Sequence, residues 1–144
     1  MGCYGDSSFL VSCYIADRHT AQAQAVLARI GGPLPFTALH ELEVTNAFQL
    51  GIFRGHITAD EAMAARGDLA ADLREGRLTR TVVKWPSVWR SAVRLSERHS
   101  MVVGSRSLDI AHVAAAVALR AGEFVSFDVR QCELARAAGL RVVA

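Results

Sequence analysis

The sequence predicts an α/β fold with a mainly parallel central sheet. Short β-rich segments alternate along the chain with longer segments that have helical spacing. Glycine, proline and capping residues separate these segments, and neither an internal repeat nor a low-complexity linker interrupts them. The chain has 144 residues, of which 51% are hydrophobic. We therefore expect a single domain over residues 1–144 with a well-developed core.

The predicted strands are short and lie next to turn residues. They cover residues 2–5, 33–36, 78–83, 123–127 and 140–143. Because longer helical segments separate most of them, successive strands are expected to pair in parallel.

The predicted helices begin at recognisable start signals. Thr37 can cap one helix, Thr58 and Glu61 have the spacing of a capping box, and Pro86 suits a first turn. Ser107 is expected to cap the apolar segment 106–120, and Gly122 to end it. The predicted helices cover residues 7–15, 19–30, 38–53, 58–74, 87–99, 107–121 and 128–138.

Composition excludes several classes of protein. The formal charge of +2 is too small to indicate nucleic-acid binding by bulk electrostatics. The three cysteines form no CxxC pair, which favours a reducing compartment over a disulfide framework. No signal peptide fits the N-terminus, and the longest apolar run, residues 110–119, is too short to span a bilayer. We expect a soluble, cytoplasmic protein with no membrane partner.

Acidic residues stand where a parallel sheet binds ligands. In open parallel sheets that place is the carboxyl edge of the strands. Asp6 directly follows the first predicted strand, and Asp128 follows the strand at 123–127. Asp109 lies in the first turn of a helix whose other side chains are almost all apolar. Such a helix is expected to be buried, so a carboxylate at its start calls for an explanation.

Glu43 is predicted to point inward from the helix at 38–53. It shares a helical face with Leu39, Asn46 and Ala47, whereas Glu41 lies on another face. No lysine or arginine lies within one helical turn of Glu43. An inward carboxylate is costly unless it is paired or bound to a metal, so Glu43 is the candidate for function and Glu41 the solvated acid.

Three of these acids also have a structural explanation. Asp6 can cap the helix that begins at Ser7, and Asp128 has capping-box spacing to Gln131. Asp109 can interact favourably with the positive end of its helix. Both explanations stay open for each acid taken singly.

Taken together, the motifs resemble a known family. GDSSFLVSCYIAD, LHELEVTNAF, GSRSLDIAHVAAA and FVSFDVRQCELARAAGL occur in that order. Their order and spacing are similar to PIN domains, and most closely to the VapC-like toxin ribonucleases of type II toxin–antitoxin systems. The family's four acids correspond to Asp6, Glu43, Asp109 and Asp128. Its small hydroxyl residue and its polar residue beyond the glutamate correspond to Ser7 and Asn46, which are candidate substrate-binding residues. Ser126 stands where the family has a threonine, and Gly5 stands where it has a larger apolar residue.

The resemblance implies a three-layer α/β/α PIN-like fold and a Mg²⁺-dependent endoribonuclease. The four acids would then be catalytic residues and metal ligands, because carboxylate oxygens suit Mg²⁺, with Mn²⁺ as a substitute. The ion would polarise the scissile phosphate of an RNA substrate and promote in-line attack by water, leaving a 5′-phosphate and a 3′-hydroxyl. A cognate antitoxin and a homodimer are implied partners. The alternative is a non-catalytic PIN-like module that binds RNA or protein.

Basic side chains supply candidate phosphate contacts. Arg106 and Arg130 each lie within three residues of a proposed metal ligand, and either can hold a phosphate near the cleavage point. Arg90, Arg94 and Arg98 form a stripe on one helix, which is either a solvated face or a track for an RNA backbone. His112 follows Asp109 by three residues, and we expect it to pack between helices or to support a metal ligand rather than to act in catalysis. The sequence leaves open which RNA is cut, whether one or two metals bind, and whether DNA is excluded.

Overall fold

The computed structural model describes residues 2–143, which form two compact units. The first unit joins the beginning of the chain, up to Asp6, with the segment from Val82 onward. The second unit is Ser7–Thr81. The chain therefore passes from one unit to the other directly after Asp6 and again after Thr81. The single domain expected over residues 1–144 remains a prediction.

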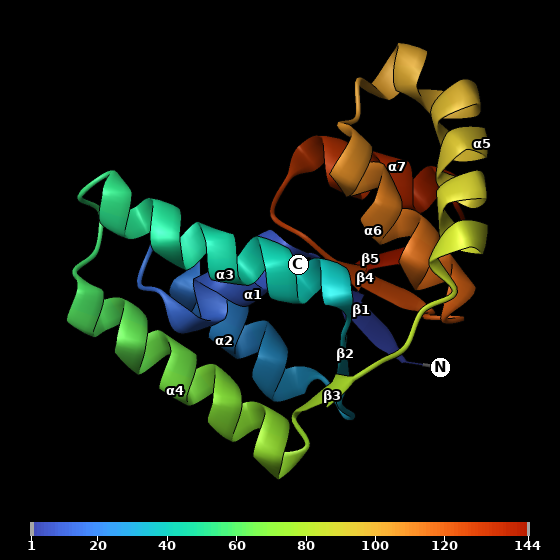
Figure 1. The fold of residues 1–144 in the computed structure, drawn as a ribbon. Helices are drawn as coiled ribbons and strands as arrows, with labels where there is room; N and C mark the ends of the chain where they lie inside the picture. Colours follow the sequence, from blue (N-terminus) through green and yellow to red (C-terminus); the bar gives the residue numbers. More distant parts are fainter. Residues whose placement is uncertain (1, 144) are drawn as a thin grey trace. The chain divides into compact units, whose positions relative to one another are not determined.

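The first unit contains a three-stranded parallel sheet. Its strands are β1 (Cys3–Gly5), β4 (Glu123–Val125) and β5 (Arg141–Val143), in the order β1-β4-β5. The helices of this unit are α5 (Trp85–Val103), α6 (Ser107–Ala118) and α7 (Val129–Ala137) (Figure 1). Strand β1 pairs with β4, more than a hundred positions later, and this pairing joins the beginning of the chain to the rest of the unit.

Helix α6 forms the centre of that unit's core. Residues 110–116 are all buried, and the four alanines among them allow α5 to pack closely against α6. Tyr4 of β1 stacks on Phe124 of β4, with ring centroids 5.7 Å apart. The almost entirely apolar composition of α6 is thus explained by burial on most of its surface.

The second unit is mainly helical. Helices α1 (Ser7–Tyr14), α2 (Thr20–Arg29), α3 (Ala38–Phe53) and α4 (Ala59–Glu75) accompany a two-stranded parallel sheet of β2 (Leu34–Phe36) and β3 (Leu78–Arg80). The predicted parallel pairing is confirmed in both units. Hydrogen bonding divides the described strands into two sheets, and each ladder pairs three residues per strand.

Several predicted helix starts are confirmed. Thr37 and Thr58 each accept a hydrogen bond from the backbone N–H three residues later. In each capping box the side chain at position N3 accepts a bond from the N-cap backbone. This residue is Glu61 for Thr58, as predicted, and His40 for Thr37. Asp128 caps α7 by accepting a bond from the N–H of Gln131. These caps hold helix starts through local contacts, which is why the sequence could predict them.

Both predicted ends of α6 were wrong. Its N-cap is Arg106 rather than Ser107, and the arginine side chain makes no capping bond. The helix ends at Ala118, and the left-handed residue that follows is Arg120, with φ +57°, rather than Gly122. The N–H groups of Arg120 and Ala121 bond to the carbonyls of residues 117 and 116, the pattern of a Schellman end, so the chain turns before it reaches the glycine.

Other boundaries differ in length. Helix α5 starts at Trp85, with Pro86 in its first turn, and runs to Val103, beyond the predicted end at residue 99. Gly104 ends it in a left-handed conformation, with φ +72°. Strands β3 and β4 are shorter than predicted because their partners offer only three paired residues. Within residues 2–143, no helix is both long and apolar enough to cross a bilayer.

Candidate active site

Asp6 lies where β1 ends, at the carboxyl edge of the three-stranded sheet. Pairing of β1 with β4 continues one step beyond the strand, because the N–H of Asp6 bonds to the carbonyl of Val125 at 3.1 Å. The Asp6 carboxylate oxygen Oδ2 accepts a hydrogen bond from the Ser126 hydroxyl at 2.6 Å. Both side chains are buried. The parallel register thus brings together two polar residues that are 120 positions apart in the sequence.

Ser126 connects Asp6 with Asp128. Its hydroxyl oxygen donates to Asp6 and accepts a bond from the N–H of Asp128 at 3.0 Å. The Oδ1 atom of Asp128 accepts from the N–H of Gln131 at 3.0 Å, which is the α7 cap. The structural explanation for Asp128 is therefore correct for one carboxylate oxygen, while Oδ2 faces an arginine.

That arginine is Arg106, which joins Asp128 to Asp109. Its Nε donates to Oδ2 of Asp109 at 2.9 Å, and one Nη nitrogen lies 3.9 Å from Oδ2 of Asp128. Asp109 is half-buried in the first turn of α6, and the Arg106 side chain is 77% exposed. Because α6 is packed on most of its surface, the Asp109 backbone is held rigidly at the start of the helix.

A polar pocket of about 410 Å³ lies beside these residues. It opens where α6 and α7 begin and contains two acids and two arginines. The lining consists of Gly104, Ser105, Arg106, Asp109, Phe127, Asp128, Val129, Arg130 and Gln131. The pocket thus combines carboxylates that can hold a cation with guanidinium groups that can hold a phosphate.

Glu43, Ser7 and Asn46 belong to the second unit. The Ser7 hydroxyl donates to the Glu43 carboxylate at 2.8 Å, and Ser7 directly follows Asp6 in the chain. Glu43 is half-buried and Ser7 is buried, whereas Asn46 is exposed. The structure therefore brings Asp6, Asp109 and Asp128 together in one unit and Glu43 together with Ser7 in the other.

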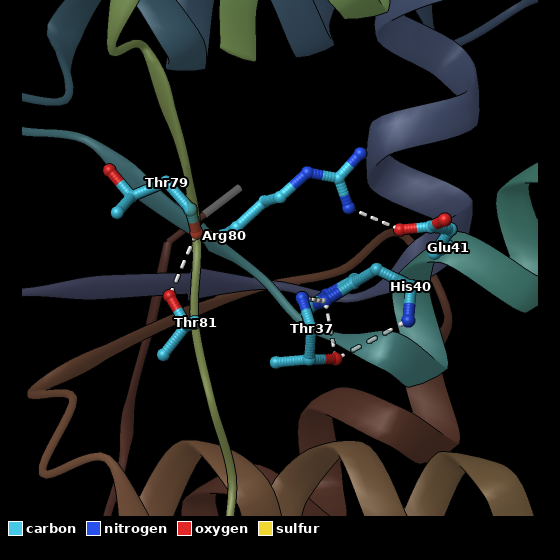
Figure 2. A network of polar contacts seen from close by, with 6 residues as sticks. All are labelled: Thr37, His40, Glu41, Thr79, Arg80 and Thr81. Carbon is cyan, nitrogen blue, oxygen red and sulfur yellow. Dashed lines mark hydrogen bonds and ion pairs between the residues drawn. The ribbon is translucent and has the colours of Figure 1, made fainter.

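Figure 2 shows how the start of α3 is held. The N–H of Thr37 donates to Nδ1 of the buried His40 at 3.0 Å, while the N–H of His40 bonds to the Thr37 hydroxyl. Glu41 is exposed and pairs with Arg80, as expected for the solvated acid of this helix. Helix α3 thus presents Glu41 and Glu43 to different surroundings.

Three titratable side chains outside the acidic set are His112, Cys3 and Cys13. His112 is buried in α6, and its Nδ1 lies 2.7 Å from the hydroxyl oxygen of Tyr4, which agrees with the packing role expected for it. Burial raises the pKa of Cys3 to about 11, and the negative charge of Glu123 adds to this effect. Burial likewise raises the pKa of Cys13 to about 12, helped by Asp72 and Asp17. These thiols stay protonated at neutral pH and are poor nucleophiles.

The acids of this region are the right kind of donor for a divalent cation, but they are not arranged as a complete set of ligands. Carboxylate oxygens are the donors that Mg²⁺ and Mn²⁺ prefer. Among residues 2–143, however, no three histidine, cysteine, aspartate or glutamate side chains are grouped so that they could hold an ion as they stand. Asp109 and Asp128 instead share the positive charge of Arg106.

Three polar residues of this region were not among the sequence-predicted site residues. Ser126 links two acids, and Ser105 and Gln131 line the pocket. The hydroxyl two residues before Asp128 was a usable signal for Ser126, because such residues commonly bond to the backbone two positions later. The capping-box spacing to Asp128 was a local signal for the position of Gln131, whereas no local pattern marks Ser105 as a pocket residue.

Comparisons with known proteins show which solved structures have a similar fold. No protein-family model matches the chain, and no curated protein sequence matches it. Among solved structures, the chain is similar to VapC20 of Mycobacterium tuberculosis, described as a Sarcin-Ricin loop cleaving toxin. The two share 18% identity and a TM-score of 0.64, over 96% of this chain and 95% of that one.

A second similar structure is VapBC2 from Rickettsia felis, bound to a DNA fragment from their promoter. Here the identity is 12% and the TM-score 0.64, over 99% of this chain and 98% of that chain. Identities this low show the fold alone. The chain has a VapC-like PIN fold, which confirms the predicted α/β/α class.

Proposed function

We propose that this protein is a metal-dependent endoribonuclease that acts as the toxin of a toxin–antitoxin pair. The observation that carries the proposal is the linked set Asp6, Asp109 and Asp128 at the carboxyl edge of the sheet. Ser126 and Arg106 connect these three acids within a single unit. An acidic cluster at this edge of a VapC-like fold suits cleavage of a phosphodiester better than any other chemistry that the site offers.

The fold comparison supports RNA as the substrate. One similar structure is named as a toxin that cleaves the Sarcin-Ricin loop, and the other as a VapBC complex. By the same likeness we propose a cognate antitoxin as partner, a homodimer, and action in the cytoplasm where RNA is available.

Each candidate residue has a proposed role. Asp6, Asp109 and Asp128, with Glu43 as the fourth acid from the sequence resemblance, would hold Mg²⁺ or Mn²⁺. Such an ion, when bound, supplies positive charge against the phosphate and favours ionisation of the attacking water. Arg106 and Arg130 line the same pocket and are proposed to bind substrate phosphates. Ser7 is proposed to orient Glu43 through their hydrogen bond, and Asn46 to contact substrate from its exposed position.

One observation favours a second candidate function. Arg106 already pairs with two of the acids, and no group of metal-binding side chains stands ready among residues 2–143. A PIN-like module that binds RNA or protein without cutting it would not need an open metal site. The two candidates differ in whether the carboxylates are required for RNA to be cleaved.

A matched pair of glutamates on α3 tests the enzyme. Purified protein is incubated with a synthetic Sarcin-Ricin loop hairpin and with total bacterial RNA, with Mn²⁺ or with EDTA. We expect cleavage only with Mn²⁺, a loss of roughly a hundredfold or more in Glu43→Gln, and little change in Glu41→Gln. Glu41 is the control because its exposed pair with Arg80 contributes little to stability.

The same variants separate the two functions in cells. Expression of the wild-type chain should slow bacterial growth, and expression of Glu43→Gln should not. Equal toxicity of the two, with no cleavage in vitro, would support the binding module instead. If Glu41→Gln were inactive and Glu43→Gln active, the assignment of the fourth acid would be wrong.

A further inference from the structure

Arg106 places a single positive charge between two carboxylates. It precedes Asp109 by three residues as the N-cap of α6, and Asp128 is the N-cap of α7. One guanidinium therefore spans the starts of two helices, at 2.9 Å from Asp109 and 3.9 Å from Asp128. Its Nε bond and its more distant Nη contact reach the Oδ2 atoms of the two acids.

This pairing is weak enough to be exchanged. The side chains of Arg106 and Asp128 are 77% and 41% exposed, and ion pairs at the surface contribute only about 0–1 kcal/mol. The side chain makes no helix-capping bond, so the first turn of α6 does not depend on capping by this side chain. Asp109 lies in the first turn of α6 and Asp128 caps α7, and Arg106 has the most exposed side chain of the three.

The pocket also contains polar atoms that the arginine does not satisfy. Among residues 2–143, neither the amide nitrogen nor the amide oxygen of the buried Gln131 has a hydrogen-bond partner, and the same holds for the Ser105 hydroxyl. Both residues line the pocket that contains Arg106. Buried polar groups are nearly always paired, so their state here points to a ligand that brings donors and acceptors with it. A divalent cation that keeps several of its waters has that property.

We propose that Arg106 and a hydrated divalent cation are alternative occupants of the Asp109–Asp128 pair. With the cation absent, Arg106 neutralises both acids and holds the pocket in its present form. With the cation bound, the same Oδ2 atoms face the ion or its waters, and the guanidinium is released toward the mouth of the pocket. Arg106 is thus a positioning residue that sets how tightly the ion binds. The inference rests on the proposed function only for the nature of the ion.

Arg130 provides the matched control. It lines the same pocket and carries the same charge, but within the described part of the chain it makes no ion pair with Asp109 or Asp128. Removing either arginine lowers the positive charge near the ion by the same amount. Only the removal of Arg106 also vacates the carboxylate oxygens.

Mn²⁺ binding, measured by calorimetry and by electron paramagnetic resonance without RNA, tests the exchange. We expect Arg106→Gln to bind Mn²⁺ roughly three- to tenfold more tightly than wild type, and Arg130→Gln to gain less than twofold. In ¹⁵N-labelled wild-type protein, the NMR signal of the Arg106 Nε–H should shift on addition of diamagnetic Mg²⁺. The midpoint of this shift should equal the midpoint of Mg²⁺ binding measured by calorimetry.

Three other outcomes would contradict the exchange, and one of them would also contradict the metal-dependent function. Equal gains in the two arginine variants, or no gain in Arg106→Gln, would overturn the exchange and leave the ribonuclease proposal intact. Absence of Mn²⁺ binding in wild type and in Arg106→Gln, both folded, would overturn the exchange and the metal-dependent function together. An unshifted Nε–H signal at saturating Mg²⁺ would show that Arg106 stays on the acids.

Discussion

At the scale of the residue, the Ser126 hydroxyl positions two of the candidate acids. Its oxygen donates to the carboxylate of Asp6 and accepts from the N–H of Asp128, so it fixes two acids from different strand ends. It is buried, and the thiol of Cys132 donates to its carbonyl oxygen at 3.3 Å. A side chain of this kind positions the acids and is not expected to react.

Removal of this hydroxyl should be costly. In Ser126→Ala the part-buried N–H of Asp128 loses its partner and the buried Asp6 carboxylate loses a donor, so the free energy of unfolding should fall by about 1–3 kcal/mol. Ser126→Thr keeps the hydroxyl and should restore most of that stability and most of the RNA cleavage. Urea unfolding and cleavage assays measure the two effects. Wild-type values for Ser126→Ala would show that the two bonds contribute nothing.

Helices α6 and α7 show how an element can serve structure and site at once. The buried body of α6 makes the position of Asp109 rigid, and the cap of α7 makes the position of Asp128 rigid. Each acid sits in or just before the first turn, where a negative charge is also favoured by the helix dipole. The cap and the site are compatible because Asp128 uses different oxygens for Gln131 and for Arg106.

The two roles of Asp128 can be separated by substitution. Asparagine caps a helix about as well as aspartate, so Asp128→Asn should unfold at a urea concentration close to that of wild type while RNA cleavage is lost. Asp128→Ala should lose the activity and also about 1 kcal/mol of stability, because the N–H of Gln131 loses its cap. If Asp128→Asn were as destabilised as Asp128→Ala, the charge of Asp128 rather than its capping bond would stabilise α7.

At the scale of the whole molecule, the chain divides its acids between two compact units. Asp6, Asp109 and Asp128 belong to one unit, and Glu43 to the other. The connection after Asp6 is a single peptide bond to Ser7, which bonds to Glu43. An ion that binds the native protein but not the unfolded chain would raise the free energy of unfolding.

Thermal unfolding in the presence and absence of Mn²⁺ measures metal binding without a substrate. At a free Mn²⁺ concentration ten times its dissociation constant, binding to the native state adds about 1.4 kcal/mol to the unfolding free energy. For a chain of this length that amounts to a rise in Tm of about 2–6 °C relative to EDTA. Asp109→Asn should show a smaller rise, because one carboxylate is lost. An identical response in wild type and Asp109→Asn would remove Asp109 from the metal site.

The sequence by itself determined the features that depend on neighbours in the chain. The capping bonds of Thr37, Thr58 and Asp128 and the different faces of Glu41 and Glu43 follow from spacings of a few residues. The parallel class of the strands also followed, because long helical connections join them. The ends of α6 were missed, since Ser107 and Gly122 carry the usual signals and the packed chain turns at Arg106 and Arg120 instead.

Only the tertiary structure decided which groups meet. The register of β1 against β4 brings Ser126 to Asp6, and the packing of α6 and α7 places Arg106 between Asp109 and Asp128. Spacing along the chain carries no record of contacts between residues a hundred positions apart. The sequence could therefore propose the acids and the arginine separately. The direct pairing of Arg106 with two acids depends on the non-local packing that closes this unit, because hydrophobic burial and strand pairing set the distances between elements.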